Sequence, residues 1–459
     1  MEFSTESEIL IVSGISNFSL LVYNTLPYNN LILDFLFWIC PQYFIIMYPD
    51  QKWNLIIFLF LVLDFNKIRP TSNSISNKEL NTAIIRILRS FISCQVAICI
   101  LGVDFTGMFP LRFGKTIDYG YKLMDVGIGS YLYNNGLMIN KDSYLKRSCP
   151  LKKRQLLNIV NNNRSIILLF LLGFIRYITI LIFNLDVEIT EYGKHSNFYF
   201  LLSILQVLYK LFPYNKLGYL LILIFHFVTR YYQIDKFILN NNRTGFIYQN
   251  KESFFAIIPY LCLLMILQDV SRILFYPFTE ELKIETNFEQ TVSPCKFINC
   301  TDCKKQDSTI KTNSPSFVNR QTSTQNIKYK IIHLSKLSLI FFVIYKLFLF
   351  YELPSRRLGN CTYIFQIAYL HTFHLLIYIV VSYFSSFKQY LSLNFVSRNM
   401  MSNFLLTNIL VLILKQLIEF KNELCHLIMI IYLVVSFILP PTICLLCKRL
   451  KINTTIFCK

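Results

Sequence analysis

Charged side chains are concentrated in one short stretch between two apolar runs of the sequence. They include Asp104, Arg112, Lys115, Asp118 and Asp125. A carboxylate can accept a proton and a basic side chain can stabilise negative charge, so this stretch could carry acid–base chemistry. A charged group left at the centre of a bilayer costs about 2.5 to 3.5 kcal/mol on insertion scales, so we expect these groups to face water, a partner or a substrate. The alternative is an interfacial ion pair between Asp104 and Lys115 that only holds the loop in place.

The elements around this stretch are predicted to be membrane-spanning helices. Of the 459 residues, 54% are hydrophobic and 15% are charged, and the mean hydropathy is +0.46, which is outside the range of ordinary soluble domains. Blocks of about 20 apolar residues cross a hydrocarbon core roughly 30 Å thick. Such blocks lie at residues 30–48, 82–103, 165–183, 252–278, 331–351, 362–384 and 424–447. The shorter runs at 53–64 and 197–212 fit half-helices as well as full spans. We therefore predict an all-α polytopic integral membrane protein with about 11 to 13 transmembrane helices.

A single domain over residues 1–459 is predicted, with a polar loop at 280–330 that is rich in Ser, Thr, Asn and Lys. That composition is typical of a segment without a packed core. Cys295, Cys300 and Cys303 in this loop offer three thiolates but no clear fourth ligand for zinc, so no metal site is predicted. The first residues lack a basic region and a small-residue cleavage site, so we expect no removable signal peptide.

The net charge of +19 lies mainly in the connections between the apolar blocks. A basic cluster between residues 141 and 154 has the composition of a cytosolic loop, because cytosolic loops of membrane proteins carry an excess of lysine and arginine. Basic residues that flank apolar spans favour anionic lipid headgroups or a phosphate-bearing small molecule as partners, rather than nucleic acid.

The charged stretch also carries a family resemblance. It reads Val103-Asp-Phe-Thr-Gly-Met-Phe-Pro-Leu-Arg-Phe-Gly-Lys-Thr, followed by Asp118-Tyr-Gly-Tyr-Lys-Leu-Met-Asp-Val-Gly-Ile-Gly-Ser130. The order Val-Asp-Phe, Phe-Pro, Arg-Phe, Lys-Thr, Tyr-Gly and Leu-Met-Asp-x-Gly-x-Gly-Ser resembles the signature of the GPI-anchored wall transfer protein family, also called class W of phosphatidylinositol-glycan biosynthesis. Two positions depart from that signature. Three residues rather than two separate Phe105 from Phe109, and Ile117 replaces a glutamate.

Shorter motifs along the chain resemble the same family. They are Val12-Ser-Gly-Ile-Ser-Asn-Phe-Ser-Leu, Leu172-Gly-Phe-Ile-Arg, Thr190-Glu-Tyr-Gly-Lys-His-Ser-Asn-Phe-Tyr-Phe, Asn242-Arg-Thr-Gly and Ser355-Arg-Arg-Leu-Gly-Asn. Near the end, Asn399-Met-Met-Ser-Asn-Phe-Leu-Leu-Thr-Asn408 is similar to the family's final motif, although Val-Leu-Ile-Leu-Lys follows where Thr-Gly-Leu-Val-Asn is expected. The resemblance covers most of the chain apart from the polar loop.

The resemblance implies an inositol acyltransferase of the endoplasmic reticulum membrane, acting on its lumenal face. Such an enzyme moves a long acyl chain from acyl-CoA to the inositol of glucosaminyl-phosphatidylinositol, with acyl-CoA as co-substrate and no metal or other cofactor. Direct transfer from a thioester to an alcohol needs a base for the hydroxyl group and stabilisation of an oxyanion. By analogy with the family motif, Asp104 is predicted to be the base, and Lys115 to orient it and stabilise the developing charge.

The resemblance also implies residues that bind the substrates. Guanidinium forks suit phosphate oxygens, so Arg112, Arg356 and Arg357 are predicted to hold the phosphates of the lipid or of CoA. A double arginine at the boundary of a span could equally be an interfacial anchor. The remaining candidates for the binding site are Asp125, Glu191, His195, Asn197 and Asn408.

Two other functions fit the sequence. A polytopic transporter of a lipid or small solute would place intramembrane charges along a substrate path and would show repeats or broken helices in matching halves. No internal repeat is visible in the sequence. A membrane-bound acyltransferase of another family would use a buried histidine, for which His371, His374 and His195 are the candidates. His371 and His374 share one face of a predicted helix, which favours packing or hydrogen bonding over a haem or metal site.

Overall fold

The part of the chain that the structure describes is mostly helical. A computed structural model describes residues 6–27, 30–68, 77–105, 109–146, 164–183, 189–212, 214–240, 242–275, 315–385, 391–417 and 424–449. No β-strand occurs among these residues, which confirms the predicted all-α class.

Contacts between helices divide the chain into two compact units, each built from segments that are distant in the sequence. Unit 1 comprises Met1–Thr71, Glu79–Asn134 and Tyr369–Lys459, and unit 2 comprises Ser72–Lys78 and Asn135–Ala368. Three of the boundaries fall inside helices, namely near the start of α5 (Asn77–Gly102), within α6 (Leu123–Lys146) and within α17 (Cys361–Phe384). The single domain expected from the sequence stays a prediction.

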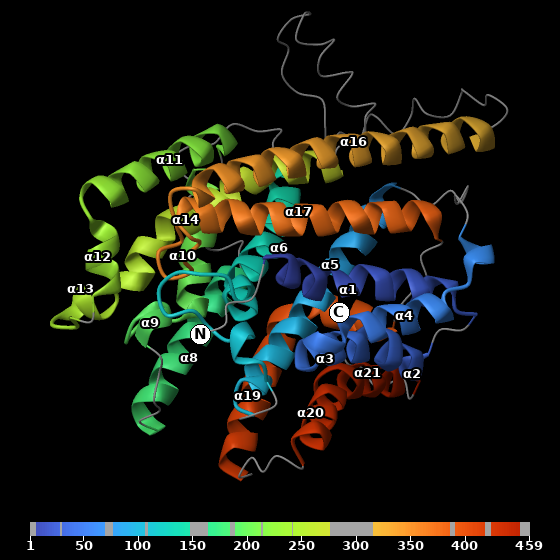
Figure 1. Ribbon diagram of the computed structural model, residues 1–459, viewed down its shortest axis with the longest axis horizontal. Coiled ribbons are helices and arrows are strands. Elements are labelled where there is room, and N and C mark those ends of the chain that lie inside the picture. Colours follow the sequence, from blue (N-terminus) through green and yellow to red (C-terminus); the bar gives the residue numbers. More distant parts are fainter. Residues whose placement is uncertain are drawn as a thin grey trace, which may run out of the picture. The chain divides into compact units, whose positions relative to one another are not determined.

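Unit 1 gathers helices from both ends of the sequence (Figure 1). They are α1 (Glu6–Thr25), α2 (Leu31–Asp34), α3 (Cys40–Met47), α4 (Lys52–Val62), α5 (Asn77–Gly102), the first half of α6, the end of α17, α18 (Leu391–Arg398), α19 (Met400–Leu417), α20 (Cys425–Leu433) and α21 (Leu439–Arg449). Short π-helical turns, Phe35–Ile39 and Val434–Ile438, join α2 to α3 and α20 to α21.

A buried carboxylate ties the two ends of the sequence together in unit 1. Asp34, at the end of α2, accepts a hydrogen bond from the hydroxyl of Tyr23 in α1. Its other oxygen accepts hydrogen bonds from the backbone N–H of Ser392 in α18 at 2.8 Å and from the Ser392 hydroxyl at 2.6 Å. Because a buried charge is costly unless it is hydrogen-bonded, these donors fix α1 and α18 to α2.

Two apolar stretches of unit 1 are bent rather than straight. Leu31–Met47 and Pro49–Val62 meet at 115°, and Leu391–Arg398 and Met400–Lys415 meet at 93°. Pro49 cannot continue a helix that began before it, because it lacks an N–H and its ring clashes with the preceding turn. The apolar run at 53–64 therefore forms the second helix of a bent pair, which agrees with the half-helix alternative for this run. Non-helical backbone at membrane depth is tolerated where it is buried in protein or lines a cavity.

Unit 2 is built around one long buried helix, α14. Its helices are the second half of α6, α8 (Arg164–Phe183), α9 (Ile189–Tyr192), α10 (Phe198–Leu211), α11 (Asn215–Tyr231), α12 (Ile234–Leu239), α13 (Phe246–Gln249), α14 (Lys251–Phe275), α16 (Pro315–Leu349) and the start of α17. α10 and α11 both pack against α14, and α8 packs against α10 (Figure 1). Residues 262–267 of α14 are fully buried, which makes this helix the core of the unit.

The helix α16 begins inside the segment that the sequence predicted to be a loop. Residues 315–330 are helical, and Pro315 stands at the first position of the helix. Proline is favoured there because its fixed backbone angle suits the first turn and its missing N–H is not needed. The preceding residues 276–314, with Cys295, Cys300 and Cys303, lie outside the described part of the chain, as does the basic segment 147–163.

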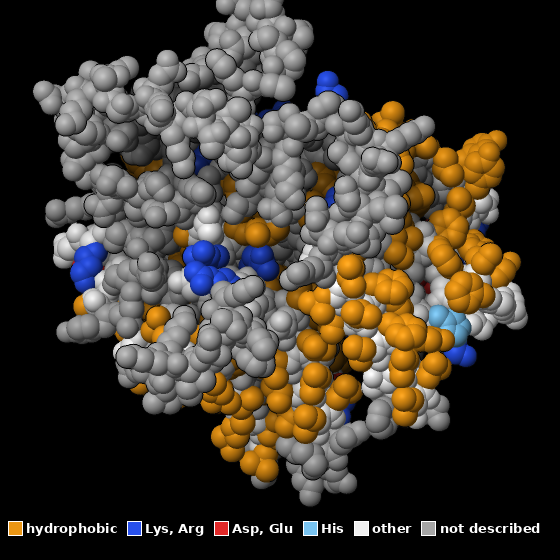
Figure 2. Space-filling model, turned by 180° about the vertical axis from the view of Figure 1, so that it is seen from behind, with side chains coloured by type: hydrophobic (Ala, Val, Ile, Leu, Met, Phe, Trp, Pro, Cys, Tyr) orange, Lys and Arg blue, Asp and Glu red, His pale blue; other side chains and the backbone are white. Residues whose placement is uncertain are grey.

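The described helices have the lengths and surfaces of a polytopic membrane protein. Six of them are long and apolar enough to cross a membrane, and the count rises to eight if each bent pair is one span. The lower end of the predicted 11 to 13 spans is reached if eight spans are counted and three further helices, from among α1, α6, α10 and α11, also cross. Figure 2 shows apolar side chains, in orange, over much of the described surface on one face. Such surfaces suit contact with lipid tails, because lipid is as apolar as leucine.

Candidate functional site

Asp104 lies just beyond the last turn of α5, and only one of its two carboxylate oxygens has a partner among the described residues. The backbone N–H of Asp104 donates to the carbonyl of Leu101 at 3.1 Å, which closes the helix end. Oδ1 lies 2.9 Å from Nζ of Lys415 in α19. Oδ2 is buried and has no hydrogen-bond partner in the described part of the chain. Since buried polar atoms are normally satisfied, Oδ2 is available to accept a hydrogen bond from a bound molecule.

The loop that follows Asp104 is anchored by Asp125. The Asp125 carboxylate is buried in the first turn of α6, and both of its oxygens accept the backbone N–H of Thr116, at 3.1 and 3.3 Å. This anchor fixes the backbone next to Lys115, which is half-buried and makes contacts of its own. The ion pair of Asp104 is with Lys415, whereas the sequence predicted Lys115 as its partner. The catalytic roles of Asp104 and Lys115, and the binding role of Asp125, stay predictions.

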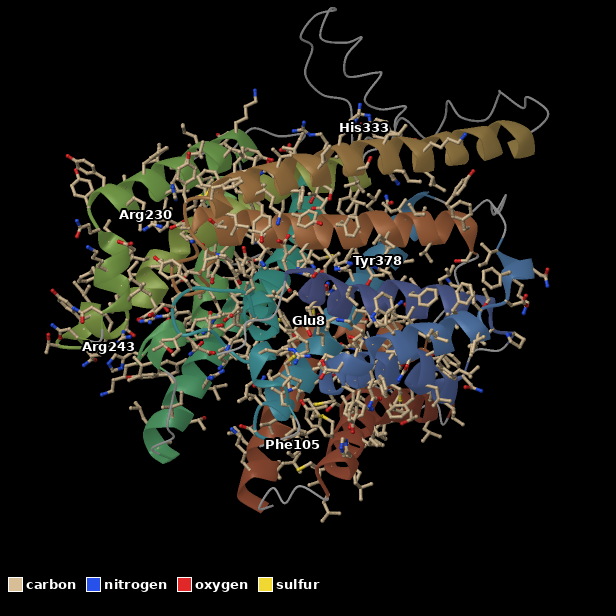
Figure 3. All side chains as sticks on the ribbon, viewed as in Figure 1. Glu8, Phe105, Arg230, Arg243, His333 and Tyr378 are labelled. Atoms are coloured by element: carbon tan, nitrogen blue, oxygen red, sulfur yellow. The ribbon has the colours of Figure 1, made fainter. Side chains whose placement is uncertain are left out.

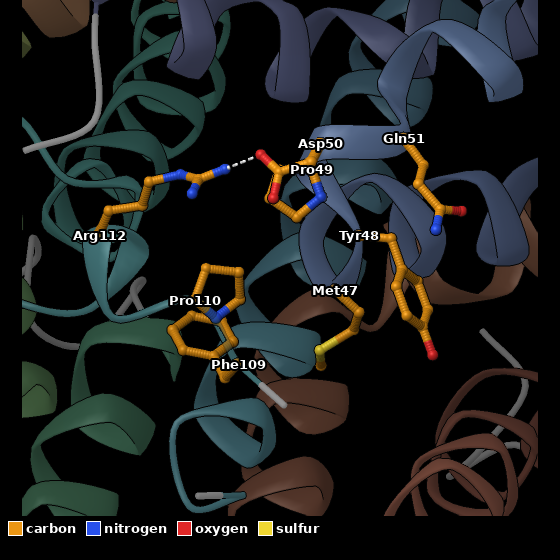
Figure 4. Close-up of a pocket in the computed structure, with 8 residues that line it drawn as sticks. All are labelled: Met47, Tyr48, Pro49, Asp50, Gln51, Phe109, Pro110 and Arg112. Atoms are coloured by element: carbon orange, nitrogen blue, oxygen red, sulfur yellow. Dashed lines mark hydrogen bonds and ion pairs between the residues drawn. The ribbon is translucent and has the colours of Figure 1, made fainter. Parts of the chain in front are cut away.

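A pocket of 320 Å³ opens beside this loop, at the break between Leu31–Met47 and Pro49–Val62 (Figure 4). It is lined by Met47, Tyr48, Pro49, Asp50, Gln51, Phe109, Pro110 and Arg112. A Cβ atom on Gly102 would lie 2.8 Å from the side chains of both Met47 and Phe109. The end of α5 that carries Asp104 therefore packs directly against two residues of the pocket wall.

Arg112 links the loop to the other side of the pocket. Its Nη2 donates to Oδ1 of Asp50 at 2.7 Å, the dashed line in Figure 4, and its Nε donates to Oε1 of Glu8 at 3.0 Å. Burial acts to lower the pKa of the Arg112 guanidinium, but the hydrogen bond to Asp50 and the charge of Glu8 outweigh burial and raise the pKa above its usual value. The pocket thus presents a permanent cation with carboxylates beside it, which suits a polar headgroup that carries both phosphate and hydroxyl groups.

A histidine from α20 holds the break that forms the pocket. His426 Nδ1 is hydrogen-bonded to the Tyr43 hydroxyl at 2.6 Å, and its Nε2 to the Tyr48 hydroxyl at 2.8 Å. The imidazole also stacks on the ring of Tyr48, with the ring centroids 5.6 Å apart. Since Tyr43 lies in α3 and Tyr48 at the break itself, His426 fixes the direction in which the chain leaves α3.

The predicted arginines of unit 2 are engaged with carboxylates, a half-buried one for Arg356 and a buried one for Arg357. Arg356 Nη1 donates to Oε1 of Glu191 at 3.1 Å, and Arg357 Nη2 donates to Oε1 of Glu252 at 3.0 Å. Glu252, which is 1% exposed, also accepts two hydrogen bonds from Arg243 at 2.6 and 2.7 Å, and Figure 3 labels Arg243. Two arginines around one buried carboxylate form a structural ion-pair network. The phosphate-binding role of Arg356 and Arg357 stays a prediction.

The loop that carries these arginines is rigidly built. Asn360 Oδ1 accepts the backbone N–H of Ser355 at 3.0 Å and that of Tyr363 at 3.1 Å, so it closes the loop and caps α17. Gly359 has φ +57°, and a Cβ atom there would lie 2.8 Å from Pro259 in α14. Only glycine fits a left-handed conformation this close to another helix.

The motif around His195 and Asn197 also has structural partners. Asn197 caps α10, because its Oδ1 accepts the backbone N–H groups of Tyr199 and Phe200 at 3.0 and 3.1 Å. Its Nδ2 donates to the carbonyl of Gly173 in α8 at 2.9 Å. His195 Nε2 is hydrogen-bonded to Oε1 of Gln249 at 2.9 Å. These contacts explain the motif as structure, and the binding roles of His195, Asn197 and Glu191 stay predictions.

The remaining candidates lie on α17 and α19. His374 is hydrogen-bonded to Asn17 and to Ser13 of α1, both at 2.9 Å, and His371 is hydrogen-bonded to Ser130 of α6 at 2.7 Å. Both histidines therefore have partners within unit 1, as groups that pack between helices do. Asn408 donates to the carbonyl of Phe404 at 2.7 Å, within its own helix α19.

Sequence reasoning missed the partners of the predicted residues, namely Glu8, Asp50, Arg243, Glu252 and Lys415. A signal existed for two of them. Lys415 follows an apolar run of α19 and Glu252 stands at the start of α14, and an ionisable residue at the edge of an apolar span is a candidate for pairing or function.

Comparisons with known proteins agree with the motif around Asp104. A family model described as GWT1 matches residues 2–442 of the chain. The GPI-anchored wall transfer protein 1 of Kluyveromyces lactis is 30% identical over 222 residues, which cover 47% of this chain and 48% of that protein. The protein of the same name from Saccharomyces cerevisiae is 30% identical over 228 residues, with 44% and 46% covered. The phosphatidylinositol-glycan biosynthesis class W protein of Dictyostelium discoideum is 26% identical over 249 residues, with 45% and 50% covered.

The matched part of the chain spans about half the length of each of these relatives. The family model, by contrast, extends over nearly the whole chain, across both units and the loop with Asp104. This polytopic helical protein therefore belongs to the GWT1 family, which confirms the resemblance seen in its motifs.

Proposed function

We propose that this protein transfers a long fatty acyl chain from acyl-CoA to an inositol hydroxyl of glucosaminyl-phosphatidylinositol, in the endoplasmic reticulum membrane. The observation that carries the proposal is the half-paired carboxylate of Asp104, whose buried Oδ2 has no partner in the described part of the chain. A general base needs such an oxygen within reach of the proton that it removes. The names of the relatives, which refer to GPI anchors and to phosphatidylinositol-glycan biosynthesis, support the choice of substrate.

In this reaction the acyl group passes directly from the sulfur atom of acyl-CoA to an oxygen atom of inositol. Oδ2 of Asp104 takes the proton of the inositol hydroxyl while the hydroxyl oxygen attacks the thioester carbonyl carbon. The new C–O bond forms, the C–S bond breaks, and the CoA thiolate leaves and takes the proton back from Asp104. Lys115 stabilises the negative charge that develops on the carbonyl oxygen, as preorganised cations do in acyl transfer. No covalent acyl–enzyme intermediate is needed.

The acceptor headgroup binds in the pocket beside the loop. The volume of 320 Å³ lies at the lower end of the range for small-molecule sites, which is about 300 to 1,000 Å³. Arg112 holds the phosphodiester of the lipid, since its guanidinium lines the pocket and keeps part of its surface exposed. Asp50 and Gln51 offer acceptors and donors to the sugar hydroxyl groups.

The test is an assay of membranes from cells that lack their own inositol acyltransferase and express this chain. Membranes with the native chain, with Asp104→Asn, or with Asp64→Asn receive glucosaminyl-phosphatidylinositol and labelled palmitoyl-CoA. The native chain should form the inositol-acylated lipid, and Asp104→Asn should lower the rate about 10²- to 10⁴-fold, the usual contribution of a general base. Asp64→Asn is the control, because Asp64 is also paired with a lysine, but its side chain is 39% exposed and it is not one of the residues that line the pocket.

Two outcomes would contradict the proposal. Equal product from the native chain and Asp104→Asn would remove Asp104 as the base. No product from a native chain that is well expressed and monodisperse would contradict the acyltransferase function itself.

A lipid transporter is the second candidate, because unit 1 has two sharply bent pairs of apolar helices, and transporters use broken helices in their substrate paths. The two functions differ in their need for acyl-CoA. In sealed vesicles without acyl-CoA, a transporter would move labelled glucosaminyl-phosphatidylinositol from one leaflet to the other. The Asp104→Asn variant would move the lipid equally well if Asp104 served only acylation.

A further inference from the structure

We infer that Lys415 is the positioning residue of the Asp104 base, an inference that rests on the proposed function. The ammonium of Lys415 lies 2.9 Å from Oδ1 of Asp104 and leaves Oδ2 buried and without a partner in the described chain. Lys415 thus holds one oxygen of the carboxylate so that the other oxygen keeps a fixed direction. It acts through Asp104 and needs no contact with substrate.

The packing of α5 and α19 sets the register that brings the two side chains together. The Asn403 amide of α19 lies 3.4 Å from the Ser93 hydroxyl of α5, and the Ser90 hydroxyl donates to the carbonyl of Leu393 in α18 at 2.7 Å. From Ser93 to Asp104 the chain advances eleven residues, and from Asn403 to Lys415 it advances twelve. At 1.5 Å per residue these advances are about 17 and 18 Å along the helix axes. Because α5 and α19 are joined at Ser93 and Asn403, Asp104 and Lys415 therefore reach the same height along the two helices.

The end of α19 is also a favourable place for the lysine. Lys415 lies in the last turn of an 18-residue helix, where the helix dipole stabilises a positive charge. The 93° bend between Arg398 and Met400 gives α19 its direction, and so decides where its last turn arrives. The ion pair is therefore built by the fold, from residues on two separate elements.

Because the ion pair of Asp104 and Lys415 is partly exposed, loss of Lys415 should affect the reaction rate more than the stability of the fold. The Lys415 side chain is 48% exposed and that of Asp104 is 19% exposed. Exposed ion pairs contribute little to folding stability, so loss of Lys415 should leave the protein folded. A carboxylate without the ammonium can rotate, and a misplacement of a reacting group by about 1 Å costs about 10²-fold in rate. The expected effect of Lys415 is therefore on the rate of the chemical step.

The test compares Lys415→Met and Lys415→Arg with the native chain, as full-length protein in detergent with lipid. Lys415→Met should lower kcat about 10²-fold and leave the KM for both substrates unchanged, because only the base is misplaced. Lys415→Arg should restore most of kcat, because it keeps the charge beside Asp104. Lys67→Met is the matched control: Lys67 is also 48% exposed and pairs with Asp64 at 3.2 Å, and its removal should leave kcat unchanged. Lys415→Gln serves if the methionine variant accumulates poorly.

A double variant tests whether Lys415 acts through Asp104. In the Asp104→Asn background, Lys415→Met should cause no further loss, because residues that act as one unit are not additive. A kcat for Lys415→Met equal to that of Lys67→Met would overturn the inference. A raised KM for acyl-CoA at unchanged kcat would also overturn it, because Lys415 would then be a binding residue. If the native chain has no acyltransferase activity, the proposed function fails and the inference falls with it.

Discussion

The buried carboxylates of this protein differ in how many of their oxygens are satisfied. Glu252 accepts hydrogen bonds from two arginines, and both oxygens of Asp125 face the N–H of Thr116. Asp104 keeps one oxygen in an ion pair and one without a partner among the described residues. A carboxylate that is fully satisfied stabilises the fold, because a free buried charge costs several kcal/mol. A carboxylate with one open oxygen keeps an acceptor for chemistry.

Glu252→Gln should destabilise the protein by about 3 to 5 kcal/mol, because it leaves the guanidinium groups of Arg243 and Arg357 without their counter-charge. The measurement is the midpoint of thermal unfolding of the protein in detergent. Asp64→Asn is the control, since it breaks an exposed pair that contributes about 0 to 1 kcal/mol. Similar midpoints for the two variants would show that the buried network contributes no more than a surface pair.

Residue types and spacing identified Asp104, Arg356 and Arg357 as noteworthy from the sequence, but not their partners. The reason is that ion pairs such as Asp104 with Lys415 join residues from opposite ends of the chain. Such pairs depend on helix packing and register, which a local pattern does not contain. Asn197 shows the opposite case, because an asparagine directly before an apolar run is a local capping signal, and it does cap α10.

At the scale of elements, hydrophobicity predicted the long helices closely. The blocks at 165–183, 252–278 and 362–384 correspond to α8, α14 and α17 within a few residues. Apolar length alone did not give the 115° and 93° bends, because the polar residues at the breaks, 50–52 and 397–399, fit a loop between two separate helices as well as a bend within one span. The helical start of α16 was missed because its first turns are polar.

Two glycines with positive φ give a matched test of how tightly the elements pack. Gly193 has φ +91° and Gly245 has φ +85°, but a Cβ atom on Gly193 would lie 2.5 Å from the carbonyl oxygen of Gln249, whereas nothing lies within 4 Å at Gly245. Gly245→Ala should cost about 1 to 3 kcal/mol through backbone strain alone. Gly193→Ala should add a clash with backbone and sharply reduce the yield of monodisperse protein. Equal yields and unfolding midpoints would show that the contact at Gly193 can relax.

At the scale of the whole molecule, apolar side chains serve two different surroundings. Most of those on α14 are buried inside unit 2, whereas many of those on α8 are exposed in the structure. Exposed leucine and phenylalanine in a chain of this composition belong to the lipid-facing surface, because lipid tails solvate them as well as protein does. The chain therefore follows the rules of membrane proteins, in which packing rather than exclusion from water holds helices together.

Two leucine-to-alanine substitutions distinguish a side chain buried in protein from one that faces lipid. Leu263→Ala in α14 removes a fully buried side chain and should cost about 2 to 5 kcal/mol, because it leaves a cavity. Leu168→Ala in α8 removes a side chain that is 58% exposed, and lipid should fill the space at little cost. Thermal unfolding in lipid nanodiscs measures both. An equal loss from Leu168→Ala would mean that this face of α8 is covered by protein.

The histidine that holds the pocket has a consequence for how the protein is made. The pocket wall comes from residues 47–51 and 109–112, but His426, which fixes the break, and Lys415, which pairs with Asp104, come from the last fifty residues. At about 5 to 20 residues per second, the ribosome needs roughly 15 to 60 s between Arg112 and His426. During that interval the first helices lack the residues that fix the break and pair with Asp104, so the proposed site is complete only after the final helices have been synthesised.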